Sequence, residues 1–238
     1  MAKLNFEDLI LFENQDYIVI NKLSHISTLD ERTGDAGSIL AMARDYHPDV
    51  QMNHRLDKET SGALAIAKNP EAYRALSMQF ENREVKKIYH AVCDGLHNFK
   101  DHQVNAPIIS LEKGIVKINF REGKPTETIF NTIAVYRAHT LVSCMPVTGR
   151  MHQIRIHLSY INAPITGDDQ YGGKPFYLSS IKKKFNLKKD TDELPLFRRV
   201  ALHASSLSFR LRNDEIIEVE APYPKDFKIL ILQLEKNS

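Results

Sequence analysis

Short extended segments separated by turn residues dominate this 238-residue chain and limit the folds that it can adopt. β-branched and aromatic residues gather in eight segments that we expect to be strands: residues 16–22, 62–67, 86–93, 114–120, 126–137, 139–147, 202–211 and 215–222. Helical periodicity is found in residues 69–82, 151–161 and 224–235. Strands and helices do not alternate as in a βαβ nucleotide-binding fold. We therefore predict an α+β fold, a largely antiparallel mixed sheet with flanking helices.

The helix expected over residues 69–82 has the clearest local signals. Asn69 is a favourable N-cap and Pro70 suits the first helical position. Ala72, Leu76 and Phe80 lie at helical spacing and predict the buried face.

Length and composition favour one cytoplasmic domain. With 42% hydrophobic residues and no evident linker, we expect a single domain over residues 1–238, working as a monomer. No stretch approaches the roughly 20 apolar residues of a membrane span, and the first ten residues lack the pattern of a signal peptide. Cys93 and Cys144 stand alone in strand-like surroundings, which indicates buried, reduced thiols.

The charge of the chain is unevenly distributed. A net charge of +2 is too weak to indicate a nucleic-acid partner by itself. Five lysines nevertheless lie within eight residues: Lys182, Lys183, Lys184, Lys188 and Lys189. Such a run is either a solvated surface or a grip on phosphates.

Several kinds of chemistry lose support because their motifs are absent. The sequence has no phosphate-binding loop, no dinucleotide fingerprint and no nucleophile elbow. His152 and His157 are five residues apart, a spacing that does not place both on one metal in a helix or a strand. We expect neither a metal nor a cofactor.

The segment Arg55–Glu59 concentrates four charged residues before an apolar run. Neighbouring cations favour the ionised form of Asp57. An ionised aspartate suits attack at an anomeric carbon or stabilisation of a cationic sugar. Taken alone, the segment could equally be an exposed, salt-bridged turn.

The order of the motifs resolves this ambiguity. From about Leu11 to Pro224 the chain closely resembles the RluA-type family of RNA pseudouridine synthases, in which the same motifs follow one another. These motifs are HRLDKETSG (54–62), KKIYHAV (86–92), PVTGRMHQIRIHL (146–158), APITGDDQYGG (163–173) and ALHASSLSF (201–209).

The resemblance implies a pseudouridine synthase catalytic fold around a central cleft, and roles for individual residues. Asp57 would be the catalytic aspartate. Tyr89 would stack on the target base and assist proton removal at C5, and Arg150 would be the partner of the aspartate. We also expect Arg55, His54 and Leu202 to contact RNA, with Leu202 under the target base.

The chain departs from the family pattern in three places. Leu23 stands where a proline is expected and His25 stands near an expected glycine. The first expected strand begins by about Asp16, so we expect no accessory RNA-binding domain before it. The stretch that carries the lysine run is enlarged.

Three functions remain open at this point. The first is an isomerase that converts uridine in structured ribosomal or transfer RNA to pseudouridine. The second is an RNA-binding relative without activity, which intact Asp57, Tyr89 and Arg150 argue against. The third is a nucleoside or glycoside hydrolase, which needs a second carboxylate. Glu59 is the nearest candidate, and in an extended chain it would point the same way as Asp57.

Overall fold

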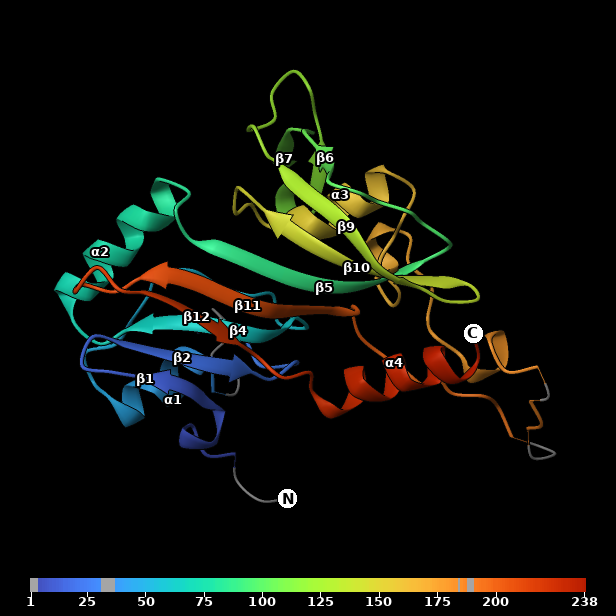
Figure 1. Cartoon of the computed structure of the whole chain (residues 1–238), viewed down its shortest axis with the longest axis horizontal. Coiled ribbons are helices and arrows are strands. Elements are labelled where there is room, and N and C mark those ends of the chain that lie inside the picture. Colours follow the sequence, from blue (N-terminus) through green and yellow to red (C-terminus); the bar gives the residue numbers. More distant parts are fainter. Residues whose placement is uncertain (1–3, 31–36, 184, 188–190) are drawn as a thin grey trace. The chain divides into compact units, whose positions relative to one another are not determined.

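The computed structural model describes residues 4–30, 37–183, 185–187 and 191–238 (Figure 1). The chain divides into two compact units, Met1–Ile88 with His203–Tyr223, and Tyr89–Leu202 with Pro224–Ser238. The chain passes between the two units within strands and after Tyr223. The single domain expected from the sequence therefore stays a prediction.

The first unit contains one sheet with the strand order β1-β2-β4-β11, with β12 paired to β11 and β3 paired to β4. β11 runs parallel to β4, whereas β1–β2, β2–β4, β3–β4 and β11–β12 are antiparallel. The strands are β1 (Ile10–Glu13), β2 (Tyr17–Lys22), β3 (Gln51–Met52), β4 (Ser61–Ala67), β11 (Leu202–Arg210) and β12 (Ile216–Glu220).

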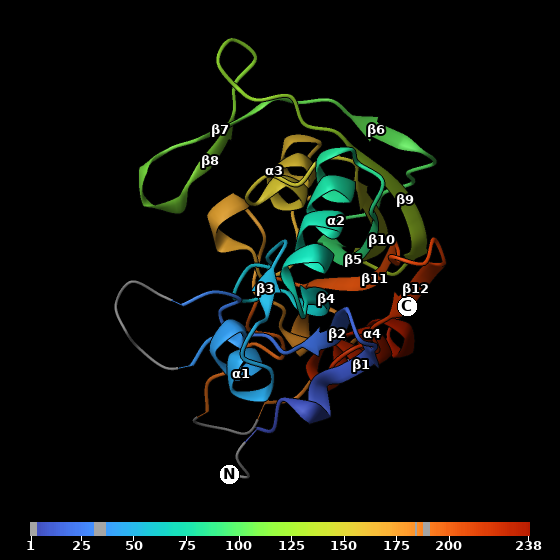
Figure 2. The ribbon, with the colours of Figure 1, turned by 90° about the vertical axis from the view of Figure 1, so that its left-hand side faces the viewer.

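Helices α1 (Ile39–Tyr46) and α2 (Pro70–Glu81) and the short 3-10 helix Glu7–Leu9 complete this unit. Asn69 caps α2 as expected, because its side chain accepts a 2.8 Å hydrogen bond from the backbone N–H of Ala72. Figure 2 shows α2 in front of β4, with which it is in contact. Ala72 and Leu76 are buried there against small residues of β4, in a core shared with Phe209 of β11.

The second unit contains a sheet with the strand order β5-β10-β9-β6, antiparallel at β5–β10, β10–β9 and β9–β6. Its strands are β5 (Lys86–Asp94), β6 (His102–Val104), β7 (Ile108–Ser110), β8 (Val116–Ile118), β9 (Thr128–Val135) and β10 (His139–Pro146). Its helices are α3 (Gln153–Tyr160), α4 (Lys225–Lys236) and the 3-10 turns Glu112–Gly114, Asp169–Tyr171 and Leu178–Ser180. Helix α3 packs against β9 and β10, while β7 and β8 form a separate antiparallel hairpin.

The α+β class with a mixed, mostly antiparallel sheet is confirmed. The sequence did not predict β1, β3, β6, β7 or helix α1. These elements are short, and four of them are strands of only two to four residues, too short to show a clear alternation of apolar and polar residues. In the part of the chain that is described, no helix combines the length and the apolar content that a membrane crossing requires.

The close approach of β4 and β11 depends on Gly62. Gly62 has φ +117°, and a Cβ atom there would lie 2.1 Å from the carbonyl oxygen of Ala204 on the paired strand. We predict that Gly62→Ala lowers the free energy of unfolding by about 3 kcal/mol or more. The added Cβ atom would collide with the backbone of Ala204, which cannot move aside as the end of a flexible side chain can. Urea unfolding measures the change. Gly37→Ala is the control, since nothing lies within 4 Å of a Cβ atom there, and equal stabilities of the two variants would contradict the prediction.

Candidate active site

Asp57 lies in the loop between β3 and β4 of the first unit and is half-buried. The backbone N–H of Thr60 donates a 3.1 Å hydrogen bond to the carbonyl oxygen of Asp57 and closes a turn through Lys58 and Glu59. Asp57 and Glu59 are therefore joined by a turn and not by an extended chain. The carboxylates of Asp57 and Glu59 therefore need not point the same way, as they would on one face of a strand.

A buried ammonium group holds this turn in place. The side chain of Lys22, at the end of β2, has no exposed surface. Its Nζ donates to the carbonyl oxygens of Leu23 at 2.9 Å, Ile26 at 2.8 Å and Lys58 at 3.2 Å. A buried charge is tolerated when its donors are satisfied in this way. The carbonyl next to Asp57 is thereby tied to the end of a core strand.

Two further contacts fix the backbone on either side of Asp57. The buried hydroxyl of Thr28 donates to the carbonyl oxygen of Leu56 at 2.7 Å and accepts from its N–H at 3.2 Å. The backbone N–H of His25 donates to the carbonyl oxygen of Lys58 at 2.7 Å. His25 has φ 65°, so the residue near the expected glycine does adopt the left-handed conformation that glycine would favour.

His54 anchors the start of the loop. Its Nε2 accepts a 3.0 Å hydrogen bond from the N–H of Ala65 in β4, and its ring lies 4.7 Å from the ring of Phe80. Burial, with a contribution from the charge of Lys87, lowers the pKa of His54 to about 3. The neutral form agrees with an Nε2 that accepts a hydrogen bond. Arg55, by contrast, is exposed.

Lys87 lies beside the same ring cluster. Its Nζ is 5.9 Å from the centre of the Phe80 ring. Burial lowers the pKa of Lys87 to about 8, so this ammonium group is partly neutral in mildly alkaline solution.

Tyr89 lies on β5 in the second unit, opposite Cys144 of β10, and is half-buried. Both free cysteines, Cys93 and Cys144, are buried as expected. Burial raises the pKa of both thiols. The strand therefore presents Tyr89 from a closely packed sheet.

Arg150 lies in the turn before α3 and is exposed, but its backbone is fixed by the buried side chain of Gln153. Gln153 Oε1 accepts hydrogen bonds from the N–H of Arg150 at 3.0 Å and the hydroxyl of Thr148 at 2.8 Å. Its Nε2 donates to the carbonyl oxygen of Glu127 and to the hydroxyl of Thr128, both at 2.9 Å. One amide thus joins the Arg150 turn to β9.

Behind this turn lies a buried imidazole. His157 Nε2 lies 2.9 Å from the carbonyl oxygen of Ala106, which can only accept, so Nε2 carries the proton. Nδ1 then accepts from the hydroxyl of Thr128 at 2.9 Å. Burial lowers the pKa of His157, while the carbonyl oxygen of Ala106 opposes the shift.

His152 and His157 have different hydrogen-bond partners. His152 precedes the helix with φ 53° and its Nδ1 lies 2.8 Å from the hydroxyl of Tyr171. The guanidinium group of Arg155, in the same helix, donates two 2.7 Å hydrogen bonds to the buried carboxylate of Asp168. Among the described residues, histidine, cysteine and carboxylate side chains form no group of three that could hold a metal ion.

Leu202 has 4% of its surface exposed and is the last residue of the segment Tyr89–Leu202 of the second unit. The guanidinium group of Arg199 donates to the carbonyl oxygens of Val200 at 3.2 Å and Leu202 at 3.3 Å. The same group is held by Asp226 of α4 through a 2.7 Å ion pair. The backbone at Leu202 is therefore fixed from the C-terminal helix.

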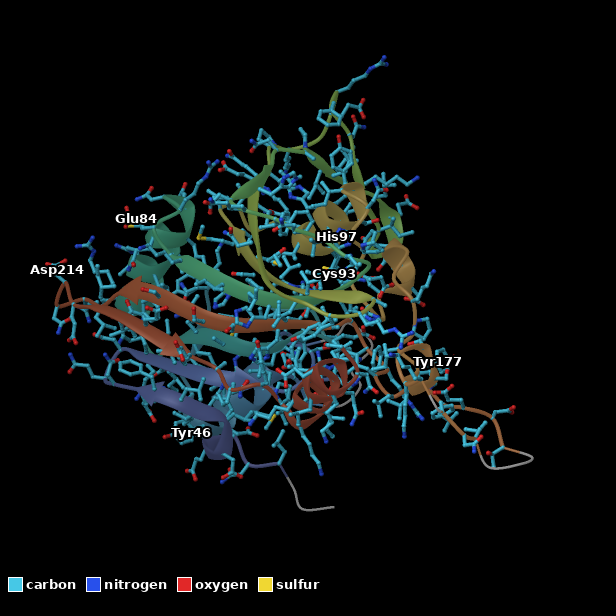
Figure 3. The ribbon with its side chains drawn as sticks, turned by 45° about the vertical axis from the view of Figure 1, so that its right-hand side comes forward. Tyr46, Glu84, Cys93, His97, Tyr177 and Asp214 are labelled. Carbon is cyan, nitrogen blue, oxygen red and sulfur yellow. The ribbon has the colours of Figure 1, made fainter. Side chains whose placement is uncertain are left out.

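Tyr177, labelled in Figure 3, precedes the 3-10 turn Leu178–Ser180, and the lysine run begins beyond this turn. Lys182 and Lys183 are exposed. Lys184, Lys188 and Lys189 lie outside the described residues.

Comparison with known proteins decides the family. Residues 16–160, more than half of the chain, match the family model described as RNA pseudouridylate synthase. The chain belongs to this family. It is an isomerase that acts on RNA, and the resemblance to the RluA-type family is confirmed.

Curated relatives and solved structures agree with this membership. Ribosomal large subunit pseudouridine synthase C of Vibrio parahaemolyticus is 34% identical over 99% of this chain and 73% of that protein. The Escherichia coli protein of the same name is 34% identical over 95% and 70%. The structure of human RNA pseudouridylate synthase domain containing 4 has a TM-score of 0.72 at 22% identity, covering 97% of this chain and 95% of that chain. The structure of human RNA pseudouridylate synthase domain containing 1 has a TM-score of 0.67 at 26% identity. This match covers 94% of this chain and 87% of that chain.

The low pKa of His54 gives a testable pH dependence. The pKa of an unperturbed histidine is 6.5 and that of His54 is about 3, so between these values the unfolded chain binds the proton and the folded chain does not. Stability therefore falls as the pH drops through this window. We predict that His54→Gln, which keeps an acceptor but does not titrate, makes the fall shallower, by up to ~1.4 kcal/mol per pH unit.

Urea unfolding of both proteins across the pH series measures this difference. The other histidines remain in both proteins, so the difference isolates His54. Parallel stability curves below pH 6.5 would contradict the assignment.

Proposed function

We propose that this enzyme isomerises uridine in large-subunit ribosomal RNA and that Asp57 is its catalytic carboxylate. The observation that supports Asp57 most directly is the backbone clamp around it. Lys22, Thr28 and His25 bind Leu56 and Lys58, its two neighbours, while its side chain stays half-buried. A catalytic group needs a fixed position of this kind.

The reaction neither adds nor removes atoms. The bond between N1 and C1′ of uridine breaks, the base turns, and C5 bonds to C1′, while C5 loses a proton and N1 gains one. Asp57 either attacks C1′ or removes the 2′ proton to give a glycal-like intermediate. Both routes require an ionised carboxylate at the sugar. Water must be kept from C1′, since its attack would release free base.

Tyr89 and Arg150 have distinct proposed roles. Tyr89 offers a ring for stacking and a hydroxyl for proton removal at C5, presented from the rigid strand β5. Arg150 offers an exposed guanidinium on a backbone that Gln153 fixes, and we propose it as the partner of Asp57. Leu202 supplies an apolar surface for the base from a backbone that Arg199 fixes.

RNA contacts come from a few exposed cations. Arg55, Lys182 and Lys183 are exposed and suited to phosphates or to an opened helix, and we extend this role to the whole lysine run. His54 is better suited to supporting the loop, because a neutral ring offers no charge to a phosphate.

The choice of ribosomal over transfer RNA is supported by relatives at 34% identity, which are named as ribosomal large subunit pseudouridine synthases. A monomer in the cytoplasm remains part of the proposal. The two buried, unpaired thiols agree with a reducing compartment.

Asp57→Asn tests the catalytic assignment. We expect loss of pseudouridine formation with RNA affinity within a few-fold of the wild type, because phosphate contacts supply most of the affinity. The assay incubates each protein with unmodified large-subunit ribosomal RNA transcript and measures pseudouridine and free uracil.

The products separate the alternatives. Pseudouridine from the wild type alone supports the proposal, free uracil indicates a hydrolase, and tight binding without either product indicates an inactive binder. Pseudouridine formation by the Asp57→Asn variant at the wild-type rate would rule out Asp57 as the catalytic group.

Tyr89→Phe separates stacking from proton transfer. The variant keeps the ring and loses the hydroxyl, so we expect RNA affinity to survive while the single-turnover rate at saturating RNA falls by roughly 10²-fold or more. Tyr89→Leu is the matched control, which should lose affinity as well. Equal loss of affinity and rate in the Tyr89→Phe variant would instead indicate a packing role.

A further inference from the structure

Phe120 is a large apolar side chain on the surface of the second unit, with 66% of its area exposed. It follows β8 at the end of the β7–β8 hairpin, which forms an arm extending away from β6 and β9 in Figure 2. Its exposure has no explanation in the roles already assigned.

The turn that carries Phe120 is held by hydrogen bonds in which the Phe120 side chain takes no part. Asn119 Oδ1 accepts hydrogen bonds from the N–H groups of Arg121 at 2.9 Å and Glu122 at 3.0 Å. The N–H of Gly123 donates to the carbonyl oxygen of Asn119 at 2.9 Å. A Cβ atom at Gly123 would lie 2.3 Å from that oxygen, so only glycine fits. The turn therefore projects Phe120 outward in a fixed direction.

The hairpin also has its own core, from which Phe120 is excluded. Ile108 and Val116 are buried with Tyr171, and the N–H of Val116 donates to the Tyr171 hydroxyl at 3.3 Å. Aliphatic side chains thus hold the arm to the rest of the unit. Phe120 gains no such burial, although burying a side chain of this size is worth about 1.5–3 kcal/mol.

A second exposed aromatic ring lies beside Phe120. Tyr160, at the end of α3, has 51% of its area exposed, and the two ring centres are 6.4 Å apart at an angle of 55°. The tilt leaves ring surface open to a third planar group. Three exposed cations, Lys117, Arg121 and Lys124, lie on the same hairpin and turn, together with two exposed carboxylates, Glu112 and Glu122.

We propose that Phe120 and Tyr160 form a stacking subsite for an unpaired base of the substrate RNA, separate from the modified uridine. Open aromatic faces bordered by cations are the chemistry by which proteins hold single-stranded nucleic acid. A protein partner would also bury Phe120, but the cations favour a polyanion. The proposal requires that the substrate is RNA, which membership of the RNA pseudouridylate synthase family supports. It does not depend on the roles proposed for Asp57 and Tyr89.

Affinity measurements test the subsite with a short single-stranded RNA of mixed sequence. Phe120→Ala should weaken binding by at least about fivefold, since one stacked base is worth ~1–3 kcal/mol. Phe120→Tyr should retain affinity and Phe120→Leu should not, because leucine is apolar but offers no π face. Ile115→Ala is the matched control on the same hairpin, where an exposed aliphatic side chain is removed. The duplex of the same RNA should bind the wild type and Phe120→Ala equally.

The chain contains no tryptophan, which permits a direct optical test. Phe120→Trp introduces a single indole that should be quenched when the single-stranded RNA stacks on it. Leu96→Trp, at a position with 63% exposure, is the control and should be quenched much less.

The single-turnover rate at saturating RNA should be unchanged in Phe120→Ala. This separates the subsite from the catalytic proposal, in which Asp57→Asn loses the rate and keeps affinity. Unchanged RNA affinity of Phe120→Ala would overturn the subsite, whether or not the variant alters association with itself or another protein. Equal quenching at positions 96 and 120, or wild-type affinity of Phe120→Leu, would also overturn it.

Discussion

The buried ammonium group of Lys22 is the interaction on which the geometry of the first unit depends. Its three carbonyl partners come from the turn after β2 and from the loop that carries Asp57. Without this cation, three carbonyl oxygens would lose a charge-assisted hydrogen bond at once. The cation in turn would be unstable in the interior without them. The same ammonium group therefore stabilises the end of β2 and the backbone beside Asp57.

In the second unit, neutral groups fix the turn that carries Arg150. Gln153 donates to the Thr128 hydroxyl, which donates to Nδ1 of His157, whose Nε2–H donates to Ala106. Each member has one orientation that satisfies its neighbours, so the chain of bonds sets the direction of every hydrogen. Burial lowers the pKa of His157, which favours the neutral imidazole that this arrangement requires. The Arg150 turn thus rests on a network of neutral hydrogen-bonding groups.

Local signals made much of this structure predictable, and long-range contacts did not. Asn69 and Pro70 predicted the start of α2 because capping involves residues within one turn. The motif order identified the loop of Asp57, but not the clamp around it, since Thr28 reaches Leu56 across 28 positions in sequence. Gln153 received no role from sequence, although a polar residue at a helix start within TGRMHQ was the available signal. The turn from Asp57 to Thr60 is held by tertiary contacts to Lys22 and His25, which no local pattern in the sequence indicates.

The distribution of charge indicates how such a chain can recognise RNA. The net charge is only +2, and three of its cations serve the interior: Lys22 is bound to carbonyl oxygens, Arg155 to Asp168 and Arg199 to Asp226. Phosphate contacts must therefore come from the smaller set of exposed lysines and arginines on loops and turns. Each such contact strengthens binding only in proportion to the counterions it releases. A protein with a net charge of only +2 gains more from contacts that salt does not screen, such as base stacking and apolar surfaces held at fixed positions. The rigid turns that present Asp57, Arg150 and Phe120 agree with recognition by shape more than by bulk charge.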